Sequence, residues 1–121
     1  MEYIFDNERP IYLQLVEMYK IEIVSGKLGP GEKLPSVREL AIICKVNPNT
    51  VQKALSELED MNLIYTERTN GKFVTDNKEI IENARKELAK EKLNNYINDM
   101  KNIGITYSEA VDYLRELGGE Y

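Results

Sequence analysis

Residues 34–75 read LPSVRELAIICKVNPNTVQKALSELEDMNLIYTERTNGKFVT, and this stretch predicts two short helices followed by a two-stranded hairpin. The first helix begins after Ser36, because Ser36 and Glu39 have the spacing of a capping box, in which each side chain bonds the other residue's backbone N–H. Apolar residues at helical spacing continue through residues 37–44. This segment therefore starts as a capped, amphipathic helix.

A second helix start follows at Asn47-Pro48, since asparagine is a preferred N-cap and proline fits the first helical position. Two helices joined so closely must cross sharply, as in a helix-turn-helix. Polar residues crowd the first half of the second helix, and asparagine and glutamine can read adenine in the major groove. A solvated helix face is the alternative interpretation. The polar residues are Asn47, Asn49, Thr50, Gln52, Lys53 and Ser56.

The hairpin favours the DNA-binding interpretation of that helix. Two runs rich in β-forming residues, 63–68 and 72–75, flank Asn70-Gly71, a pair typical of a type I′ turn with two positive φ angles. Arg68 and Lys72 lie beside the tip, where cations suit phosphate or the minor groove. A hairpin in this place after a recognition helix predicts a wing.

The ordered motifs across residues 10–75 resemble the GntR family of bacterial transcription regulators, and most of all its YtrA-like branch. The resemblance implies a winged helix-turn-helix that binds operator DNA. It rests on Pro10-Ile11-Tyr12-Leu13-Gln14-Leu15, Gly31-Glu32-Lys33-Leu34-Pro35-Ser36-Val37-Arg38-Glu39-Leu40-Ala41, Val46-Asn47-Pro48-Asn49-Thr50-Val51-Gln52-Lys53-Ala54-Leu55, Leu58-Glu59 and Gly71-Lys72-Phe73-Val74.

The same resemblance implies DNA contacts from Arg38, from the start of the recognition helix and from Gly71 at the wing tip. A guanidinium in the first turn of its helix suits bidentate binding of phosphate or guanine, whereas a local ion pair with Glu39 or Glu32 is the alternative. Lys53 is either a DNA contact or an ordinary surface lysine. The candidate DNA-binding residues are Ser36, Arg38, Asn47, Asn49, Thr50, Gln52, Lys53, Asn70, Gly71 and Lys72.

The sequence departs from the family pattern at several places. Lys45 stands in the turn where many relatives have glycine, so a left-handed conformation there would cost roughly 1 kcal/mol. The wing has Thr69-Asn70-Gly71 instead of a Gly-x-Gly sequence, and Gln52 stands where many relatives have arginine. We therefore expect a different operator base at the position that Gln52 reads.

The composition fits a small folded protein, because 42% of the 121 residues are hydrophobic. A net charge of −5 argues against a simple nucleic-acid binder. The charge is unevenly distributed, since residues 33–53 contain four basic residues and one acidic residue, whereas residues 79–121 are net acidic. An acidic remainder limits non-specific DNA binding.

Several classes of function lack the residues they need. The chain has no histidine and one cysteine, which leaves no zinc set of the usual spacing and no nucleophile with a histidine base. We expect no cofactor, no metal and no enzymatic activity. Neither a signal peptide nor an apolar run approaching the ~20 residues of a membrane span is evident, so we expect a cytoplasmic protein.

Helices are also predicted outside the central stretch, at residues 11–25, about 77–102, and after a second capping box at Thr106 and Glu109. The two C-terminal helices are too few to enclose a core, and a second copy of the chain is the economical partner, although folding back on the first domain is the alternative. The candidate dimerisation residues are Ile81, Ala84, Leu88, Tyr96, Met100, Ile103, Val111 and Leu114.

The sequence therefore predicts a mainly α fold with a small β wing: a winged helix-turn-helix domain, residues 1–76, and a two-helix dimerisation tail, residues 77–121. The expected function is a transcription regulator, and repression is the expected sign, with a homodimer on a two-fold symmetric double-stranded operator. A winged-helix module that binds proteins and no DNA is the alternative. The sequence does not indicate whether a small-molecule effector, a partner or protein abundance alone supplies the inducing signal.

Overall fold

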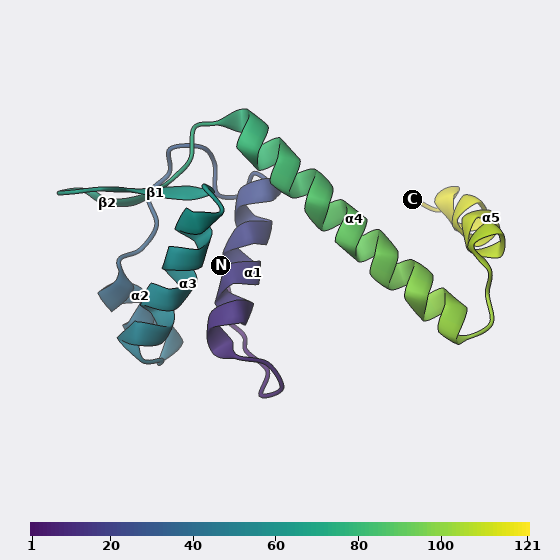
Figure 1. Ribbon diagram of the computed structural model, residues 1–121, viewed down its shortest axis with the longest axis horizontal. Coiled ribbons are helices and arrows are strands. Elements are labelled where there is room, and N and C mark those ends of the chain that lie inside the picture. Colours follow the sequence, from purple (N-terminus) through teal and green to yellow (C-terminus); the bar gives the residue numbers. More distant parts are fainter. The chain divides into compact units, whose positions relative to one another are not determined.

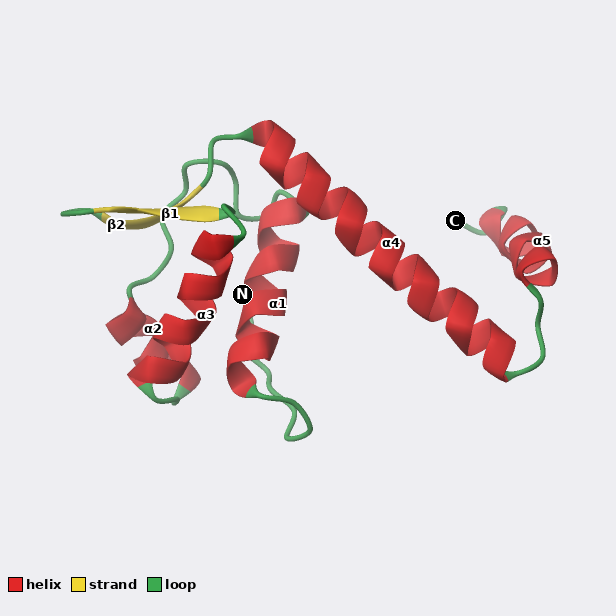
Figure 2. Ribbon diagram, in the orientation of Figure 1, coloured by secondary structure: helices red, strands yellow, loops and turns green.

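A computed structural model describes all residues from 1 to 121 (Figures 1 and 2). Three helices and a hairpin form the first part of the fold, and two further helices follow. Within the first part, α3 packs against both α1 and α2, and β1 follows directly from α3. The elements are α1 (Ile11–Val24), α2 (Val37–Cys44), α3 (Pro48–Asp60), β1 (Ile64–Glu67), β2 (Gly71–Val74), α4 (Lys78–Asn102) and α5 (Tyr107–Gly118).

The starts of α2 and α3 confirm the predicted caps. Ser36 Oγ accepts from the backbone N–H of Glu39 at 3.1 Å, and the Glu39 carboxylate accepts from the backbone N–H of Ser36 at 3.2 Å. Asn47 Oδ1 accepts from the backbone N–H of Asn49 at 2.7 Å. Between these helices Lys45 is left-handed, with φ 56° and ψ 46°, so this lysine adopts the conformation that glycine adopts more easily.

The core lies where the apolar faces of α1, α2 and α3 meet the base of the hairpin. Apolar side chains at helical spacing supply most of it, as the sequence predicts. Its fully buried members come from the three helices, from β2 and from the residues just before α2 and β1. They include Leu15, Tyr19, Ile23, Leu34, Leu40, Val51, Leu55, Leu58, Leu63 and Val74.

The hairpin is confirmed, but the predicted type I′ turn at Asn70-Gly71 is wrong. Glu67 pairs with Gly71, so residues 68–70 form the connection and Gly71 belongs to β2. Gly71 has φ 108°, whereas Asn70 does not have a positive φ. The turn closes one residue earlier, because the backbone N–H of Asn70 donates to the carbonyl of Glu67 and its side-chain amide donates to the Glu67 carboxylate.

A third backbone segment pairs with the outer edge of β2. The backbone N–H of Leu34 donates to the carbonyl of Lys72 at 2.8 Å, and Lys33 forms an antiparallel bridge with Phe73. The sequence predicts only a loop here, because residues 27–33 contain glycine and proline and no apolar alternation. The bridge therefore attaches the chain just before α2 to the wing.

The N-terminal segment is held by one buried polar side chain. Gln14 is 3% exposed, and its amide donates to the carbonyls of Asp6 and Arg9 at 3.1 and 2.8 Å, while its oxygen accepts from the backbone N–H of Asp6 at 2.9 Å. Every polar atom of this amide group is thereby satisfied inside the fold.

We expect Gln14→Leu to lower the free energy of unfolding by about 2 kcal/mol, because it leaves backbone groups of Asp6 and Arg9 without partners. Urea denaturation measures this change. Gln52→Leu is the control, since Gln52 is exposed on α3 and its replacement should change stability by less than about 0.5 kcal/mol. Equal stability of the two variants would contradict this role of Gln14.

The chain divides into two compact units, residues Met1–Arg85 and Lys86–Tyr121. The division falls within α4, later than the boundary after residue 76 that the sequence suggests. Its cause is that Ile80, Ile81 and Ala84, in the first turns of α4, pack against the core of the first unit.

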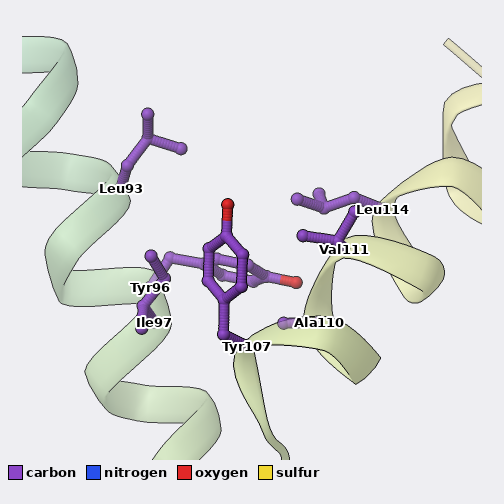
Figure 3. A pocket seen from close by; sticks show the side chains of 7 residues that line it. All are labelled: Leu93, Tyr96, Ile97, Tyr107, Ala110, Val111 and Leu114. Atoms are coloured by element: carbon purple, nitrogen blue, oxygen red, sulfur yellow. The ribbon is translucent and has the colours of Figure 1, made fainter.

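The second unit contains the rest of α4 and all of α5. Its predicted capping box is confirmed, since Thr106 Oγ1 accepts from the backbone N–H of Glu109 at 3.2 Å and the Glu109 carboxylate accepts from the backbone N–H of Thr106 at 3.4 Å. Ala110 is the only buried residue of this unit. A cavity of about 150 Å³ lies between the two helices (Figure 3), and it is lined by Leu93, Tyr96, Ile97, Tyr107, Ala110, Val111 and Leu114.

No helix of the chain combines the length and the apolar character that a membrane span requires.

Candidate nucleic-acid interface

Helix α3 separates an apolar face from a polar one. Val51, Ala54, Leu55 and Leu58 are buried against the core. The polar residues of its first half point away from that core, as a helix needs if it is to enter the major groove. Asn47, Asn49, Gln52 and Lys53 are exposed, and Thr50 is half-buried.

Hydrogen bonds within the helix already engage some of these polar groups. Asn47 Oδ1 caps the helix, which leaves its side-chain NH₂ as the group free to reach DNA. Gln52 Nε2 donates to Ser56 Oγ at 3.1 Å, so its oxygen is the more available atom. Asn49 contributes its backbone N–H to the cap and keeps an exposed side-chain amide. Asn49 is therefore the residue best prepared for two hydrogen bonds to adenine.

Arg38 is exposed in the first turn of α2 and takes part in none of the salt bridges of the chain. The structure does not show the alternative, an ion pair between Arg38 and Glu39 or Glu32. The Glu39 carboxylate accepts from the Ser36 backbone, and the Glu32 carboxylate accepts from the backbone N–H of Gly29. The Arg38 guanidinium is thus available to an outside anion.

Lys53 contacts an aromatic ring and is therefore more restrained than an ordinary surface lysine. Its ammonium lies over the ring of Tyr12, 3.9 Å from the ring centroid. Such a cation–π contact contributes roughly 0.5–1 kcal/mol at an exposed site. Tyr12, at the start of α1, therefore restrains a cation on the polar side of α3.

Lys72 points toward α3. Its ammonium forms an ion pair with the Glu59 carboxylate and donates to Thr66 Oγ1 at 2.9 Å, and its side chain is 16% exposed. Hydrogen bonds from Lys72 and Thr66 hold the pKa of the Glu59 carboxyl below its ordinary value of 4.5. The sequence identified Lys72 as a wing cation but gave no sign that Glu59, near the end of α3, would engage it.

We expect Lys72→Gln to destabilise the fold by less than about 1 kcal/mol at neutral pH, because the ion pair is partly solvated. The lowered pKa of Glu59 means that its contribution is complete above pH 4.5 and is lost as the pH falls through the folded value. The stability difference between wild type and variant should therefore shrink in acid. Urea denaturation across the pH range measures it, and a constant difference would contradict the pairing.

The wing tip combines an exposed connection with a glycine that approaches another chain segment. Arg68 and Asn70 are exposed. A Cβ on Gly71 would lie 3.1 Å from Cε of Lys33, so the Lys33 side chain passes directly over this glycine. In the sequence, Lys33 contributes only to a local positive charge, because nothing there shows that residue 33 lies beside residue 71.

The structure divides the candidate dimerisation residues between two environments. Ile81 and Ala84 pack on the core of the first unit, which reduces what they can offer a partner. Leu88, Tyr96, Met100 and Val111 are half-buried, and Ile103 and Leu114 are exposed. The second unit has further exposed apolar side chains outside this set of candidates, namely Leu93, Tyr107, Tyr113 and Leu117.

Comparison with known proteins identifies the family. The family described as bacterial regulatory proteins, gntR family, matches residues 11–74. The transcriptional repressor YtrA of Bacillus subtilis (strain 168) is 37% identical over 94% of this chain and 88% of its own length. This similarity supports the YtrA-like branch.

Solved structures agree with that assignment. A GntR family transcriptional regulator from Listeria monocytogenes superposes with a TM-score of 0.84 at 41% identity, over 93% of this chain and 98% of that chain. AraR(DBD) in complex with operator ORX1 superposes with a TM-score of 0.57 at 30% identity, over 62% of this chain and 96% of that chain. These relatives are regulators and not enzymes. The chain has a winged-helix DNA-binding domain and belongs to the gntR family of bacterial regulatory proteins.

Proposed function

We propose that this chain is a transcriptional repressor that binds a two-fold symmetric DNA operator as a homodimer in the cytoplasm. The observation that carries the proposal is the exposed, polar first half of α3 beside an unpaired Arg38. A helix of this kind enters the major groove, where side-chain amides distinguish base pairs by their donors and acceptors. The likeness to a YtrA repressor supports the repressive sign.

Each side chain at the interface has a distinct proposed role. Asn49 and Gln52 read base edges, with Asn47 and Thr50 beside them at the start of α3. Arg38 binds backbone phosphate or guanine. The hairpin lies against the neighbouring phosphates or the minor groove, and the Lys33 side chain takes the space that Gly71 leaves free of a Cβ. Phosphate contacts set the register of the protein on the duplex, while base contacts select the sequence.

The exposed apolar side chains of the second unit support the proposed dimer. It buries only Ala110 and leaves large apolar side chains exposed, including Leu93 at 54%, Ile103 at 73% and Leu117 at 50%. Two helices with this much exposed apolar surface gain stability by burying it against a partner. In a symmetric dimer the same surface serves both copies, and two recognition helices then reach half-sites about 34 Å apart or a multiple of that distance.

A salt titration distinguishes DNA binding from the alternative of a winged helix that binds only proteins. Gel shifts of the purified chain on the upstream region of its own gene should show a specific complex whose affinity falls steeply as salt rises, because bound phosphates release counterions. A transcription assay on the same duplex should then show less transcript when the chain is added. Binding that ignores salt, or a rise in transcript, would contradict the corresponding part of the proposal.

A further inference from the structure

We propose that Lys33, which lies outside the hairpin, supplies a phosphate-binding cation to the wing, while Lys72 stabilises the wing from inside. The inference rests on the proposed DNA-binding function and assigns a contact within that interface. Lys33 is not among the candidate DNA-binding residues that the sequence indicates. Lys72 is among them, and the structure gives it a different role.

The backbone places Lys33 beside the wing. Lys33 bridges Phe73 in antiparallel fashion, and the flanking hydrogen bonds join Leu34 N to Lys72 O and Val74 N to Glu32 O, at 2.8 and 2.9 Å. Hydrogen bonds on both sides of residue 33 fix its position along β2. Lys33 therefore belongs structurally to the wing, although it precedes the hairpin by thirty residues or more.

The side chain of Lys33 reaches the wing tip. Its Cε lies 3.1 Å, and its Nζ 3.9 Å, from the point where a Cβ of residue 71 would be, so the absence of a side chain at Gly71 makes room for it. Lys33 also lies near the start of α2. Hydrogen bonds from Ser36 are the main cause of the lowered pKa of the Glu39 carboxyl, and the positive charge of Lys33 lowers that pKa further. This places the ammonium on the side of the fold that carries both Gly71 and the first turn of α2.

The two lysines differ in what already neutralises them. Lys33 is exposed and forms no salt bridge within the chain. Lys72 is paired with Glu59 and hydrogen-bonded to Thr66, with its side chain 16% exposed. A phosphate would have to compete with Glu59 for Lys72, whereas no carboxylate forms an ion pair with Lys33. Of these two lysines, Lys33 is therefore the phosphate ligand, and Arg68 at the exposed tip is a further wing cation without a salt bridge.

The test compares Lys33→Gln with Lys72→Gln, two variants that each remove one positive charge from the wing. Fluorescence anisotropy measures affinity at several salt concentrations for a labelled duplex enriched from a random-sequence library by the wild-type chain. A lost phosphate contact lowers the magnitude of the slope of log affinity against log salt by about 0.9 per copy, or about 1.8 for a homodimer. We expect this change in Lys33→Gln, recovery in Lys33→Arg, and no change of slope in Lys72→Gln.

Thermal unfolding of each variant keeps a folding defect separate from a binding defect. Lys33→Gln should unfold at the wild-type temperature, since its side chain is exposed. An unchanged slope in Lys33→Gln, or an equal loss in both glutamine variants, would overturn the inference while leaving DNA binding intact. Failure of the wild type to enrich or bind any duplex would instead overturn the proposed function, and this inference with it.

Discussion

Replacing Arg38 with alanine is expected to abolish tight operator binding without unfolding the chain. Arg38 is exposed in the first turn of α2, and its guanidinium has no acidic partner within the fold. Loss of one arginine contact to DNA costs about 1–3 kcal/mol, and a homodimer loses two, which gives about 2–6 kcal/mol in all. Anisotropy titration should therefore show a reduction of at least about 30-fold in affinity.

Arg38→Lys reveals what this arginine contacts. Lysine keeps the charge but loses the bidentate geometry. Recovery of most of the affinity would indicate phosphate binding, whereas weak binding with relaxed sequence preference would indicate a guanine contact. Arg85→Ala is the matched control, because Arg85 is an exposed arginine of the same unit that pairs with Glu82. Equal affinity of the Arg38→Ala variant and the wild type would contradict the proposed interface.

Leu114→Glu is expected to convert a dimer to a monomer and, with that, to weaken operator binding by about 100-fold or more. Leu114 lines the cavity between α4 and α5 and is 47% exposed, so the substitution places a charge on the apolar surface that these two helices leave open to solvent (Figure 3). A linked second site raises overall affinity by about 10²–10⁴ without any new contact, and a monomer forfeits that gain.

Analytical ultracentrifugation measures the mass, and anisotropy on the same sample measures the affinity. Ser108→Glu is the matched control, because it introduces the same charge at an exposed polar position of α5. The control should stay dimeric and bind as the wild type does. A Leu114→Glu protein that remains dimeric would show that this surface is not the interface, and a wild type that is monomeric would contradict the dimer itself.

Local signals allowed the helices to be predicted well. Both capping boxes, at Ser36 and at Thr106, and the Asn47 cap act over a few residues, so their spacing in the sequence is sufficient evidence for them. The left-handed conformation of Lys45 is different, because the sequence indicates only that this conformation would be costly for lysine and not that Lys45 adopts it. The β-rich runs predict the hairpin but not its turn type, because Asn70 bonds Glu67 and closes the turn one residue earlier.

Features that depend on contacts between distant residues were not accessible from the sequence. The pairing of Lys72 with Glu59 joins the hairpin to the end of α3, and neither residue differs in sequence from an ordinary surface charge. The bridge from Lys33 to Phe73 joins a predicted loop to a strand. The packing of Ile81 against the core of the first unit has the same origin, because an apolar helical stripe shows that Ile81 needs a partner but not which one.

Sequence-specific binding by a homodimer is tested directly by selection with the wild-type chain from a random library of DNA duplexes, followed by sequencing of the bound fraction. If the chain binds DNA through α3 as a homodimer, the enriched duplexes should share an inverted repeat whose half-sites are separated by about one helical turn or a multiple of it. Enrichment of a single unrepeated site would contradict the dimeric arrangement. Recovery of no shared sequence from a folded sample would contradict sequence-specific DNA binding.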